Sequence, residues 1–325
     1  MQVLDDIADL TGLAGPVHLA IGVFDGLHLG HRAVIEAARA SAVELGGTVV
    51  VVTFDPHPVE VLAPGQAPRL LTDTPHKLRL LGRGAGVDRV LLVRFDLGFA
   101  ALDGAEFVDR LLAAAPPGGI ARICVGRDWR FGKGRSGDLA LLERLGTERG
   151  FGVTGVGTVE IDGERVSSTR VREAVASGDL GTGARLLGRR YSVHGTVVEG
   201  RRLGRTLGFP TANLAVNREQ LPPEGVYAVR ATGAGDSWDG VANLGHRPTV
   251  EEGEAELRLE VHLFGLDHGI YGEDLEVEFV AKVREERKFD GLEALQAQIA
   301  GDVEAAKAVL AAKCLKSGVD SEHKI

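Results

Sequence analysis

Two histidines, His28 and His31, lie three residues apart at a predicted junction between a strand and a helix. The strand is expected to end at Phe24, and the helix is expected to begin just after Gly30. In an open α/β sheet the first strand-to-helix turn binds phosphates, because backbone N–H groups and the positive end of the helix converge there. Two imidazoles on this turn could stabilise the charge that grows when a phosphoryl group is attacked. The spacing alone also fits a metal pair or two surface histidines.

The residues around this turn favour the phosphate site over those alternatives. Its glycines keep the turn free of side chains, and Asp25 adds a polar group beside the histidines. The predicted nucleotide- and phosphate-binding residues of the turn are Gly22, Phe24, Asp25, Gly26 and Gly30.

A second segment suited to phosphate chemistry runs from Gly200 to Leu214, with the sequence GRRLGRTLGFPTANL. Its glycines allow a loop to pass close to a ligand, and its arginines supply positive charge. Thr211 and Asn213 are two residues apart on a predicted extended strand, so their side chains point to one side. They could share a Mg²⁺ ion and its phosphate oxygens. The pair alone also fits an ordinary strand residue and a turn-forming Asn.

The elements that position the first site alternate between strands and helices from Val17 to about Gly188. The predicted strands are continuous apolar runs, which suit a parallel sheet covered by helices on both faces. We therefore predict an α/β doubly wound domain. The strand sequences are VHLAIGVF, TVVVVTF, DRVLLVRF and ARICVG, and the helical sequences are GHRAVIEAARASAVELG, TPHKLRLLG and GAEFVDRLLAAA.

The pattern changes after LGTGARLLGRR to short β-type runs separated by Gly and Pro. Five or six such runs predict a small antiparallel β-barrel. A helix over 291–312 is expected to close this domain, and the polar tail after it is expected to fray. A length of 325 residues suggests about two domains, which we place at 1–186 and 187–325. The predicted apolar positions of the last helix are Leu292, Leu295, Ile299 and Val303.

The composition excludes several functional classes. A formal charge of −9 argues against a nucleic-acid-binding protein, because such proteins normally carry a basic domain. No apolar run approaches the roughly 18 residues of a membrane span, and the acidic N-terminus does not resemble a signal peptide. Cys124 and Cys314 provide no disulfide framework and neither resembles a catalytic thiol, which suits a reduced compartment. We expect a cytoplasmic protein with small-molecule substrates, no nucleic-acid or membrane partner, and a monomeric or weakly oligomeric state.

Four ordered segments of the first half resemble the FMN adenylyltransferase module of prokaryotic bifunctional riboflavin kinase/FAD synthetases. They are HLGH after the first turn, TFDPHP at 53–58, VGRDWRFGKGRSGD at 125–138 and RVSSTRVRE at 165–173. The resemblance implies that His28 and His31 hold the ATP phosphates. It also implies contacts to the nucleotide, the triphosphate and the leaving pyrophosphate, and flavin-side aromatic rings. The nucleotide-side residues would be Asp128, Arg165, Ser168, Thr169 and Arg172, and the flavin-side residues would be Phe54 and Phe131.

These assignments have plainer alternatives. The hydroxyls of the Ser-Ser-Thr run could cap a helix and bind no ligand. Phe54 and Phe131 could be ordinary core residues. The run GKGRSG is not a P-loop, because Gly134 follows Lys133 where a P-loop has Ser or Thr. It fits either a phosphate-side loop or a solvated basic loop.

The second half resembles the riboflavin kinase barrel in the order and spacing of LGFPTANL, EGVYAV, GVANLGHRPTV, LEVHLF, IYG and VREERKF. The resemblance implies Glu260 as the base that accepts the proton of the riboflavin 5′-hydroxyl. An exposed strand carboxylate is the alternative for Glu260, and a surface ion pair is the alternative for Arg284 and Glu286. The implied Mg²⁺ and ATP ligands are Thr211 and Asn213, the nucleotide-binding loop contributes Gly204, Arg205 and Gly208, and the flavin-side residues are Arg284 and Glu286.

Together the two resemblances predict an enzyme with two ATP-dependent steps. Riboflavin would be phosphorylated to FMN in the second half, and FMN would be adenylylated to FAD with release of pyrophosphate in the first. Positioning, Mg²⁺ and oriented donors can carry such chemistry without a covalent intermediate. The alternatives are an adenylyltransferase for another phosphorylated alcohol, which the second half disfavours, and a flavin-storing protein without turnover.

Overall fold

The computed structural model describes residues 1–84, 87–200, 208–216, 218–233, 235–246 and 257–319, without the side chains of His246, Leu257 and 313–319. Its contacts divide the chain into two compact units. The first contains Met1–Arg170 and Leu186–Gly188, and the second contains Val171–Arg185 and Arg189–Ile325. The segment 171–185 thus groups with the second unit, and the predicted boundary between residues 186 and 187 stays a prediction.

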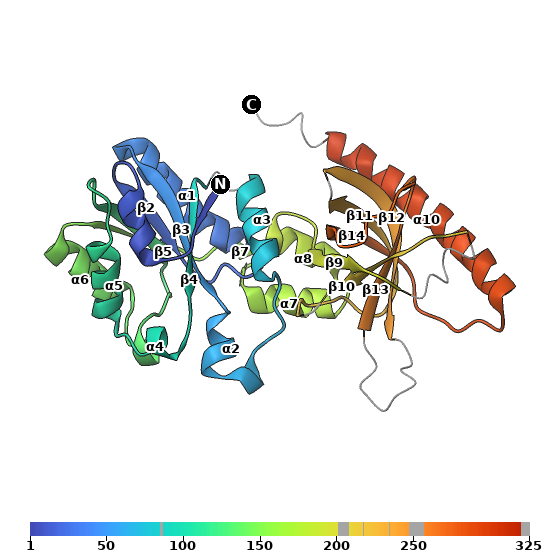
Figure 1. The fold of residues 1–325 in the computed structure, drawn as a ribbon, viewed down its shortest axis with the longest axis horizontal. Helices are drawn as coiled ribbons and strands as arrows, with labels where there is room; N and C mark the ends of the chain where they lie inside the picture. The colour runs from blue at the N-terminus through green and yellow to red at the C-terminus, as the bar shows by residue number, and fades with distance from the viewer. Residues whose placement is uncertain (85–86, 201–207, 217, 234, 247–256, 320–325) are drawn as a thin grey trace. The chain divides into compact units, whose positions relative to one another are not determined.

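The described part of the first unit contains a six-stranded parallel sheet in the order β1-β4-β3-β2-β5-β6 (Figure 1). The strand order reverses at β2, which lies between β3 and β5. Open α/β sheets bind ligands in the crevice at the carboxyl ends of the strands where the order reverses. The strands are β1 (Gln2–Leu4), β2 (Val17–Ile21), β3 (Thr48–Asp55), β4 (Arg89–Arg94), β5 (Ile120–Gly126) and β6 (Gly152–Val156).

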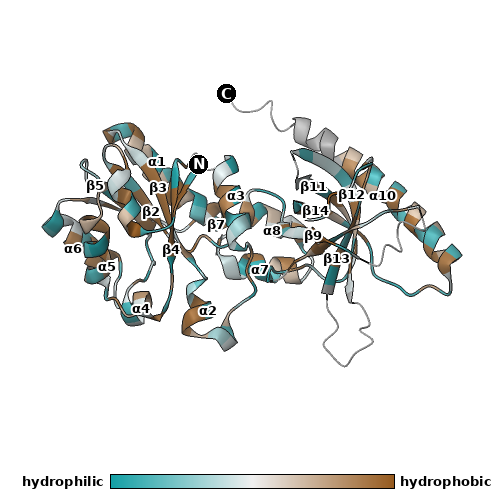
Figure 2. Ribbon diagram, viewed as in Figure 1, coloured by the Kyte–Doolittle hydropathy of each residue, from teal (hydrophilic) through white to brown (hydrophobic). Residues whose placement is uncertain are grey.

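Helices cover both faces of this sheet, as predicted. Along β2, Leu19 and Ile21 belong to a core cluster with residues of two helices, α5 (Gly104–Ala113) and α6 (Leu139–Arg149). Ala20 belongs to a second cluster, with residues of α1 (Leu29–Leu45) and α3 (Thr74–Gly84). This alternation follows from the two-residue side-chain period of a strand. Figure 2 shows these helices as mixtures of hydrophilic and hydrophobic residues, as expected for elements that bury one side.

The remaining elements of this half are short. Two of them, β7 (Glu160–Ile161) and β8 (Glu164–Arg165), pair with each other as a small hairpin. The short helices are α2 (Pro58–Leu62), α4 (Leu97–Ala100), α7 (Ser168–Ala176) and α8 (Leu180–Leu187), and the 3₁₀ turns are η1 (Ile7–Gly12), η2 (Pro64–Gln66) and η3 (Lys133–Arg135).

Two expected boundaries at the first turn were wrong by a few residues. The strand ends at Ile21 and not at Phe24, and the helix begins at Leu29 and not after Gly30. The reason is the backbone: Phe24 has a φ of 54°, which a strand does not accommodate. The strands β1 and β6 were not predicted, because one has three residues and the other carries two glycines.

The second unit contains a closed antiparallel barrel with the order β10-β13-β12-β11-β14-β9, in which β9 and β10 complete the ring. This confirms the predicted barrel. Leu259, Val261 and Leu263 alternate along β13 as buried residues, so Glu260 and His262 lie on its outer side. The strands are β9 (Ser192–Val198), β10 (Ala212–Ala215), β11 (Gly225–Gly233), β12 (Asp236–His246), β13 (Leu257–Leu263) and β14 (Asp274–Arg284).

A long helix, α10 (Leu292–Val319), runs along the outside of this barrel (Figure 1). Val303 on α10 packs with Val226 and Val241 of the barrel wall in one apolar cluster, and Ile299 borders that cluster. The prediction for Leu292 was wrong: it stands at the first residue of the helix and is 59% exposed. The helix also continues past the expected end at residue 312.

Candidate active sites

The turn between β2 and α1 is folded tightly by positive backbone angles. Phe24, Gly26 and Leu27 have φ values of 54°, 79° and 45°, a region that costs a non-glycine residue free energy. A Cβ atom at Gly22 would lie 3.1 Å from the Phe24 ring. Backbone in such conformations persists where the surrounding structure imposes it, often at ligand sites. The residues predicted at this turn therefore shape its backbone.

Asp25 fixes the turn to a neighbouring segment through hydrogen bonds of its side chain. Its side chain is 3% exposed, and Oδ1 accepts hydrogen bonds from the backbone N–H groups of Leu71 at 2.8 Å and Thr72 at 2.9 Å. The Thr72 hydroxyl in turn accepts a bond from the Gly26 N–H at 3.0 Å. The carboxylate therefore ties the turn to the segment before α3, and its predicted contact with a nucleotide stays a prediction.

The two histidine rings stack on each other at the start of α1. Their centroids are 3.6 Å apart, with an angle of 15° between the planes. The His28 Nδ1 atom accepts a hydrogen bond from the backbone N–H of His31 at 3.3 Å and thereby caps the helix. Because Nδ1 is an acceptor, a neutral His28 carries its proton on Nε2. A Cβ atom at Gly30 would lie 3.2 Å from two atoms of the His28 ring, so glycine leaves room for that ring.

His31 is held in its neutral form. Burial lowers the pKa of His31 well below its usual value, and the neighbouring positive charges of His28 and Lys77 lower it further. The edge of the His31 ring meets the Phe24 ring at a centroid distance of 5.3 Å. Its Nδ1 atom is buried without a hydrogen-bond partner among the described residues. A neutral imidazole beside a second ring whose Nδ1 already accepts a hydrogen bond suits an anionic phosphate, to which an Nε2–H group can donate.

The start of α7 meets the same turn. The Ser168 hydroxyl donates to the carbonyl oxygen of Asp25 at 3.0 Å. Ser167, one residue earlier, caps α7 by accepting from the Arg170 N–H at 3.3 Å. The capping alternative therefore applies to Ser167, while Thr169 is exposed in the first turn.

The structure also brings Arg165 and Asp128 together. These two predicted nucleotide-side residues form an ion pair on the surface, although they are far apart in the sequence. In the loop after Asp128, Arg130 forms an ion pair with Asp138 at 2.7 Å, whereas Lys133 and Arg135 are exposed. Arg172 is counted with the second unit.

The predicted flavin-side rings lie in the core of the first unit. Phe54 and Phe131 are each 7% exposed and belong to the same apolar cluster. Trp129 stacks on Phe131 with centroids 4.4 Å apart and is itself only partly buried. This arrangement fits the core alternative for Phe54 and Phe131, and their contact with a flavin stays a prediction.

In the barrel, three polar residues form a row across neighbouring strands. Glu260 on β13 stands opposite Asn213 of β10 and opposite Asn243 of β12. Residues directly opposite in an antiparallel pair have Cβ atoms about 4.5–5.5 Å apart, on the same face of the sheet. The row therefore places one carboxylate between two amides on the outer wall of the barrel.

Glu260 and Asn243 face a cavity of about 280 Å³ between this wall and α10, which we name the helix-side cavity. In the described part of the chain the Glu260 carboxylate has no hydrogen bond or ion pair, so its oxygens can accept a proton from a ligand. The apolar side of the cavity suits a flat aromatic ligand. Its lining includes Thr211, Asn243, Glu260, Phe289, Leu295 and Ile299.

Thr211 borders a second cavity of about 220 Å³ as well, which we name the loop-side cavity after the segment 266–271 that lines it. Asn213 lines neither cavity: it is 8% exposed, and a Cβ atom at Gly200 would lie 2.2 Å from its amide nitrogen. Gly208 has a φ of 87°, where glycine is favoured. Gly204 and Arg205 lie outside the described residues.

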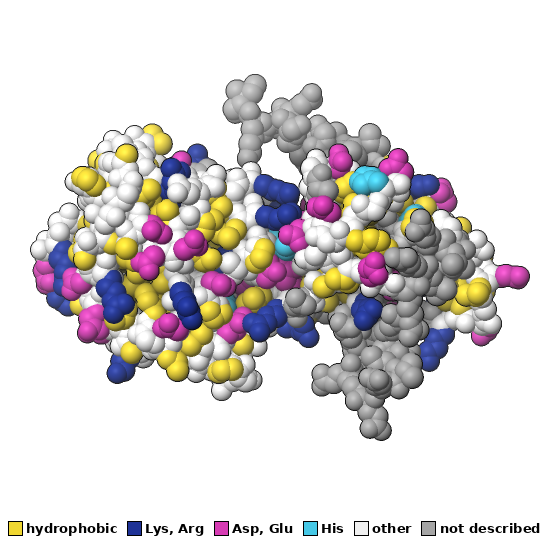
Figure 3. Space-filling model, in the orientation of Figure 1, with side chains coloured by type: hydrophobic (Ala, Val, Ile, Leu, Met, Phe, Trp, Pro, Cys, Tyr) yellow, Lys and Arg dark blue, Asp and Glu magenta, His cyan; other side chains and the backbone are white. Residues whose placement is uncertain are grey.

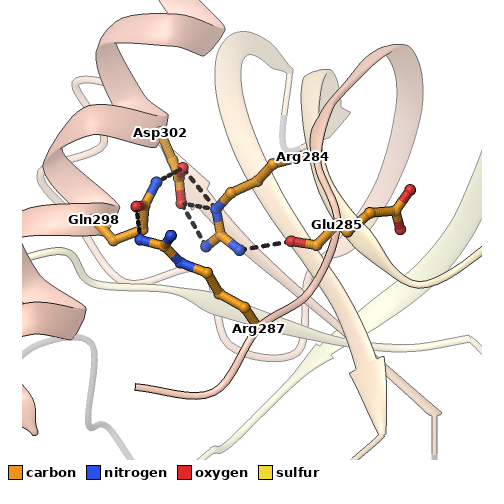
Figure 4. A network of polar contacts seen from close by, with 5 residues as sticks. All are labelled: Arg284, Glu285, Arg287, Gln298 and Asp302. Carbon is orange, nitrogen blue, oxygen red and sulfur yellow. Dashed lines mark hydrogen bonds and ion pairs between the residues drawn. The ribbon is translucent and has the colours of Figure 1, made fainter. Parts of the chain in front are cut away.

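Arg284 is held by α10 (Figure 4). Its guanidinium donates to both carboxylate oxygens of Asp302, and Gln298 also donates to Asp302 at 2.7 Å. Gln298 accepts a hydrogen bond from Arg287. The carboxylate that binds Arg284 in the structure therefore comes from α10, and the part that Arg284 and Glu286 play beside a flavin stays a prediction.

Glu286 lies close to β12. A Cβ atom at Gly245 would lie 2.3 Å from the Glu286 carboxylate, so glycine makes this approach possible. Arg284 and Glu286 both line the helix-side cavity.

The sequence did not identify three polar residues of these sites. Asn243 faces Glu260 only through strand register, and register cannot be read before the pairing is known. Asp302 lies on the last helix, for which the sequence predicted only the apolar positions. Lys77 lies in a predicted helix, and its burial at 4% exposure has no signal in the local pattern.

Comparisons with known proteins agree on both halves. Residues 13–170 match the family model for FAD synthetase, and residues 187–310 match the model for riboflavin kinase. The bifunctional riboflavin kinase/FMN adenylyltransferase of Pseudomonas fluorescens is 45% identical over 90% of this chain and 92% of its own length. The protein of the same name from Escherichia coli K12 is 44% identical over 87% of this chain and 90% of its own length.

A solved structure described as a macrolide-efflux protein from Streptococcus pneumoniae is also similar. It is 30% identical, has a TM-score of 0.79, and the match covers 94% of this chain and 98% of that one. Among the described residues, we find no helix with the length and apolar character that a bilayer crossing requires. The chain belongs to the family of bifunctional riboflavin kinases/FMN adenylyltransferases.

Proposed function

We propose that the chain phosphorylates riboflavin in the helix-side cavity of the barrel and adenylylates the resulting FMN at the turn between β2 and α1. The two activities are those of its family. The observation that supports the residue assignments most directly is the position of Thr211. It borders both barrel cavities, while Glu260 faces one of them without a partner in the described part of the chain.

The two cavities divide the kinase substrates between them. The helix-side cavity has an aromatic and aliphatic wall for the flavin rings, including Phe289 and Ile299. We assign the nucleotide of ATP to the loop-side cavity. Because Thr211 lines this cavity as well, the γ-phosphate lies near Thr211. The riboflavin 5′-hydroxyl then meets the γ-phosphorus between the cavities. Glu260 accepts the hydroxyl proton as the oxygen attacks, and ADP leaves.

Mg²⁺ fits the donors on this wall. Thr211 and Asn213 offer a hydroxyl and an amide oxygen, and Mg²⁺ prefers oxygen ligands shared between a protein and phosphates. The close approach of Gly200 to Asn213 leaves no room for a further side chain there. When bound, the ion neutralises phosphate charge. The chain's own residues orient the hydroxyl and accept its proton.

At the first turn the attacked atom is the α-phosphorus of ATP and not the γ-phosphorus. A phosphate oxygen of FMN attacks the α-phosphorus of ATP, and pyrophosphate leaves. His28 donates from Nε2 to the phosphates, and neutral His31 lies beside it. Arg165 at the end of β8 and Thr169 in the first turn of α7 bind the leaving phosphates, with Arg165 exchanging Asp128 for the ligand.

The substrates are small molecules, and the protein works in the cytoplasm. Among the side chains that Figure 3 colours by type, basic and acidic groups are interspersed on the face drawn. That distribution gives no footprint for a nucleic-acid backbone on this face.

The test is an incubation with riboflavin and Mg²⁺-ATP, followed by chromatographic separation of the flavins. The wild-type chain should form FMN and then FAD. Glu260→Gln should stop at riboflavin but still convert supplied FMN, and His28→Ala should accumulate FMN. If either variant loses the activity assigned to the other site, the assignment of sites is wrong.

A further inference from the structure

Lys77 is a buried cation beneath the first turn. It lies on α3 and is 4% exposed. Its ammonium group donates to the carbonyl oxygen of Val23 at 3.2 Å, to the Thr53 hydroxyl at 3.3 Å and to the carbonyl oxygen of Phe54 at 3.4 Å. An ammonium has three N–H donors, so these contacts use them all. The lysine therefore links the segment after β2 to the end of β3.

Burial of a lysine side chain at this position costs free energy, because the ammonium group loses its hydration. Burial lowers the pKa of Lys77, and nearby carboxylates counteract that effect. A well-packed apolar residue would avoid the loss of hydration that a buried charge suffers. The retained charge therefore points to a task beyond packing. The four carboxylates whose charges act on it come from four segments and are Asp25, Asp55, Asp73 and Glu60.

The contacts of Lys77 lead directly to the histidines. The Val23 carbonyl also accepts a hydrogen bond from the Thr53 hydroxyl at 2.9 Å, so two side-chain donors, Thr53 and Lys77, hold it in place. Val23 precedes Phe24, whose ring meets the edge of His31. The charge of Lys77 also lowers the pKa of His31. One side chain thus affects both the shape of the turn and the protonation of a ring on it.

We propose that Lys77 is a positioning residue for adenylyl transfer: it holds the backbone at Val23 and Phe54 so that the turn sets His28 and His31 against the ATP phosphates. The inference rests on the proposed function of that turn. Lys77 does not touch the substrate and acts through the backbone it binds. The kinase site in the second unit does not depend on it, which gives each variant an internal control.

The test compares Lys77→Met with Arg79→Met, a control two residues further along the same helix. Conversion of FMN to FAD by Lys77→Met should fall in kcat by about 10²-fold, because a displacement of about 1 Å in positioning residues can cost that much. Formation of FMN from riboflavin should stay at the wild-type rate. Titration of the His31 ring by NMR should show a higher pKa than in the wild-type protein. Arg79→Met should change none of these quantities.

Wild-type kcat for FAD formation in Lys77→Met would overturn the proposal, as would an unchanged His31 pKa. If Lys77→Met does not fold, Lys77→Gln replaces it, because the amide keeps two N–H donors and removes the charge. The kcat for FAD formation and the pKa of His31 then test the proposal in that variant. His28→Ala distinguishes a failure of the proposed function of the turn from a failure of the role of Lys77. If His28→Ala keeps full FAD formation, the proposed function of the turn fails; if it loses activity while folded Lys77 variants keep theirs, only the role of Lys77 fails.

Discussion

The carboxylate of Asp302 on α10 holds the guanidinium of Arg284, the last residue of β14, through hydrogen bonds of 2.7, 2.9 and 3.1 Å (Figure 4). Asp302 is almost fully buried. Arg284 is the last residue of β14, and the segment that contains Phe289 follows it. The pair therefore fixes one wall of the helix-side cavity to the helix on its other side.

Asp302→Ala should weaken riboflavin binding by the kinase. The substitution leaves Arg284 without its buried partner, and losing one member of a buried pair typically costs about 3–5 kcal/mol. We expect a raised KM for riboflavin and a lower unfolding midpoint for the barrel, with FAD formation from supplied FMN unchanged. Glu304→Ala is the matched control, because its ion pair with Lys307 is exposed and contributes little. An unchanged KM in the Asp302 variant would show that the pair does not order the cavity.

Glu260→Gln should abolish most kinase turnover. The amide keeps the shape of the side chain but cannot accept the hydroxyl proton, and general-base catalysis is typically worth about 10²–10⁴-fold. Steady-state FMN formation measures the effect. A smaller loss would indicate that Glu260 mainly orients the hydroxyl, since loose phosphoryl transfer depends on positioning. Glu273→Gln, an exposed carboxylate of the same barrel, should behave as wild type.

Gly30→Ala should reduce adenylyl transfer although both histidines remain. The added methyl group would lie 3.2 Å from the His28 ring and would displace it from its bond to the His31 N–H. FAD formation from FMN should fall at least tenfold while kinase activity persists. Gly301→Ala in α10 is the control, because nothing lies within 4 Å of its added carbon. There the change should stabilise the helix by about 0.5–1 kcal/mol.

The first unit should lose stability when the pH falls below about 6.5. The pKa of His31 is lower in the folded chain than in the unfolded one, so the unfolded state binds the proton more readily across that interval. Stability then rises with pH through this window and levels off above it. Denaturant unfolding followed by Trp129 fluorescence, at several pH values, measures it. In His31→Gln this component of the pH dependence should disappear.

Cys124 should resist thiol reagents until the first unit unfolds. Burial raises the pKa of this thiol to about 11, and the thiolate is the reactive form. A Cys314→Ser background leaves Cys124 as the only thiol of the chain. Fast modification under native conditions would contradict the burial of this strand residue.

The sequence predicted the fold class and the segments that carry the sites, because both depend on local patterns. Apolar runs with helices between them indicate a covered parallel sheet, and Gly-separated β runs indicate a barrel. The sequence could not show which groups face each other. The carboxylate that binds Arg284 depends on helix docking, and the two asparagines opposite Glu260 depend on strand register; both are properties of the folded chain. The same limit applies to Asp25: the sequence did not show that its carboxylate binds the backbone N–H groups of Leu71 and Thr72.

The two sheets differ in what they offer to another polypeptide chain. In the barrel, β9 and β10 pair with each other and close the ring, so each described strand of that ring has a neighbour on both sides. The parallel sheet is open, and its first edge is covered only by β1, which pairs with β4 over three residues. Removal of residues 1–6 would expose the apolar strand RVLLVR as a template for strand addition. We expect such a shortened chain to self-associate through β4, an outcome that light scattering of the purified protein would detect.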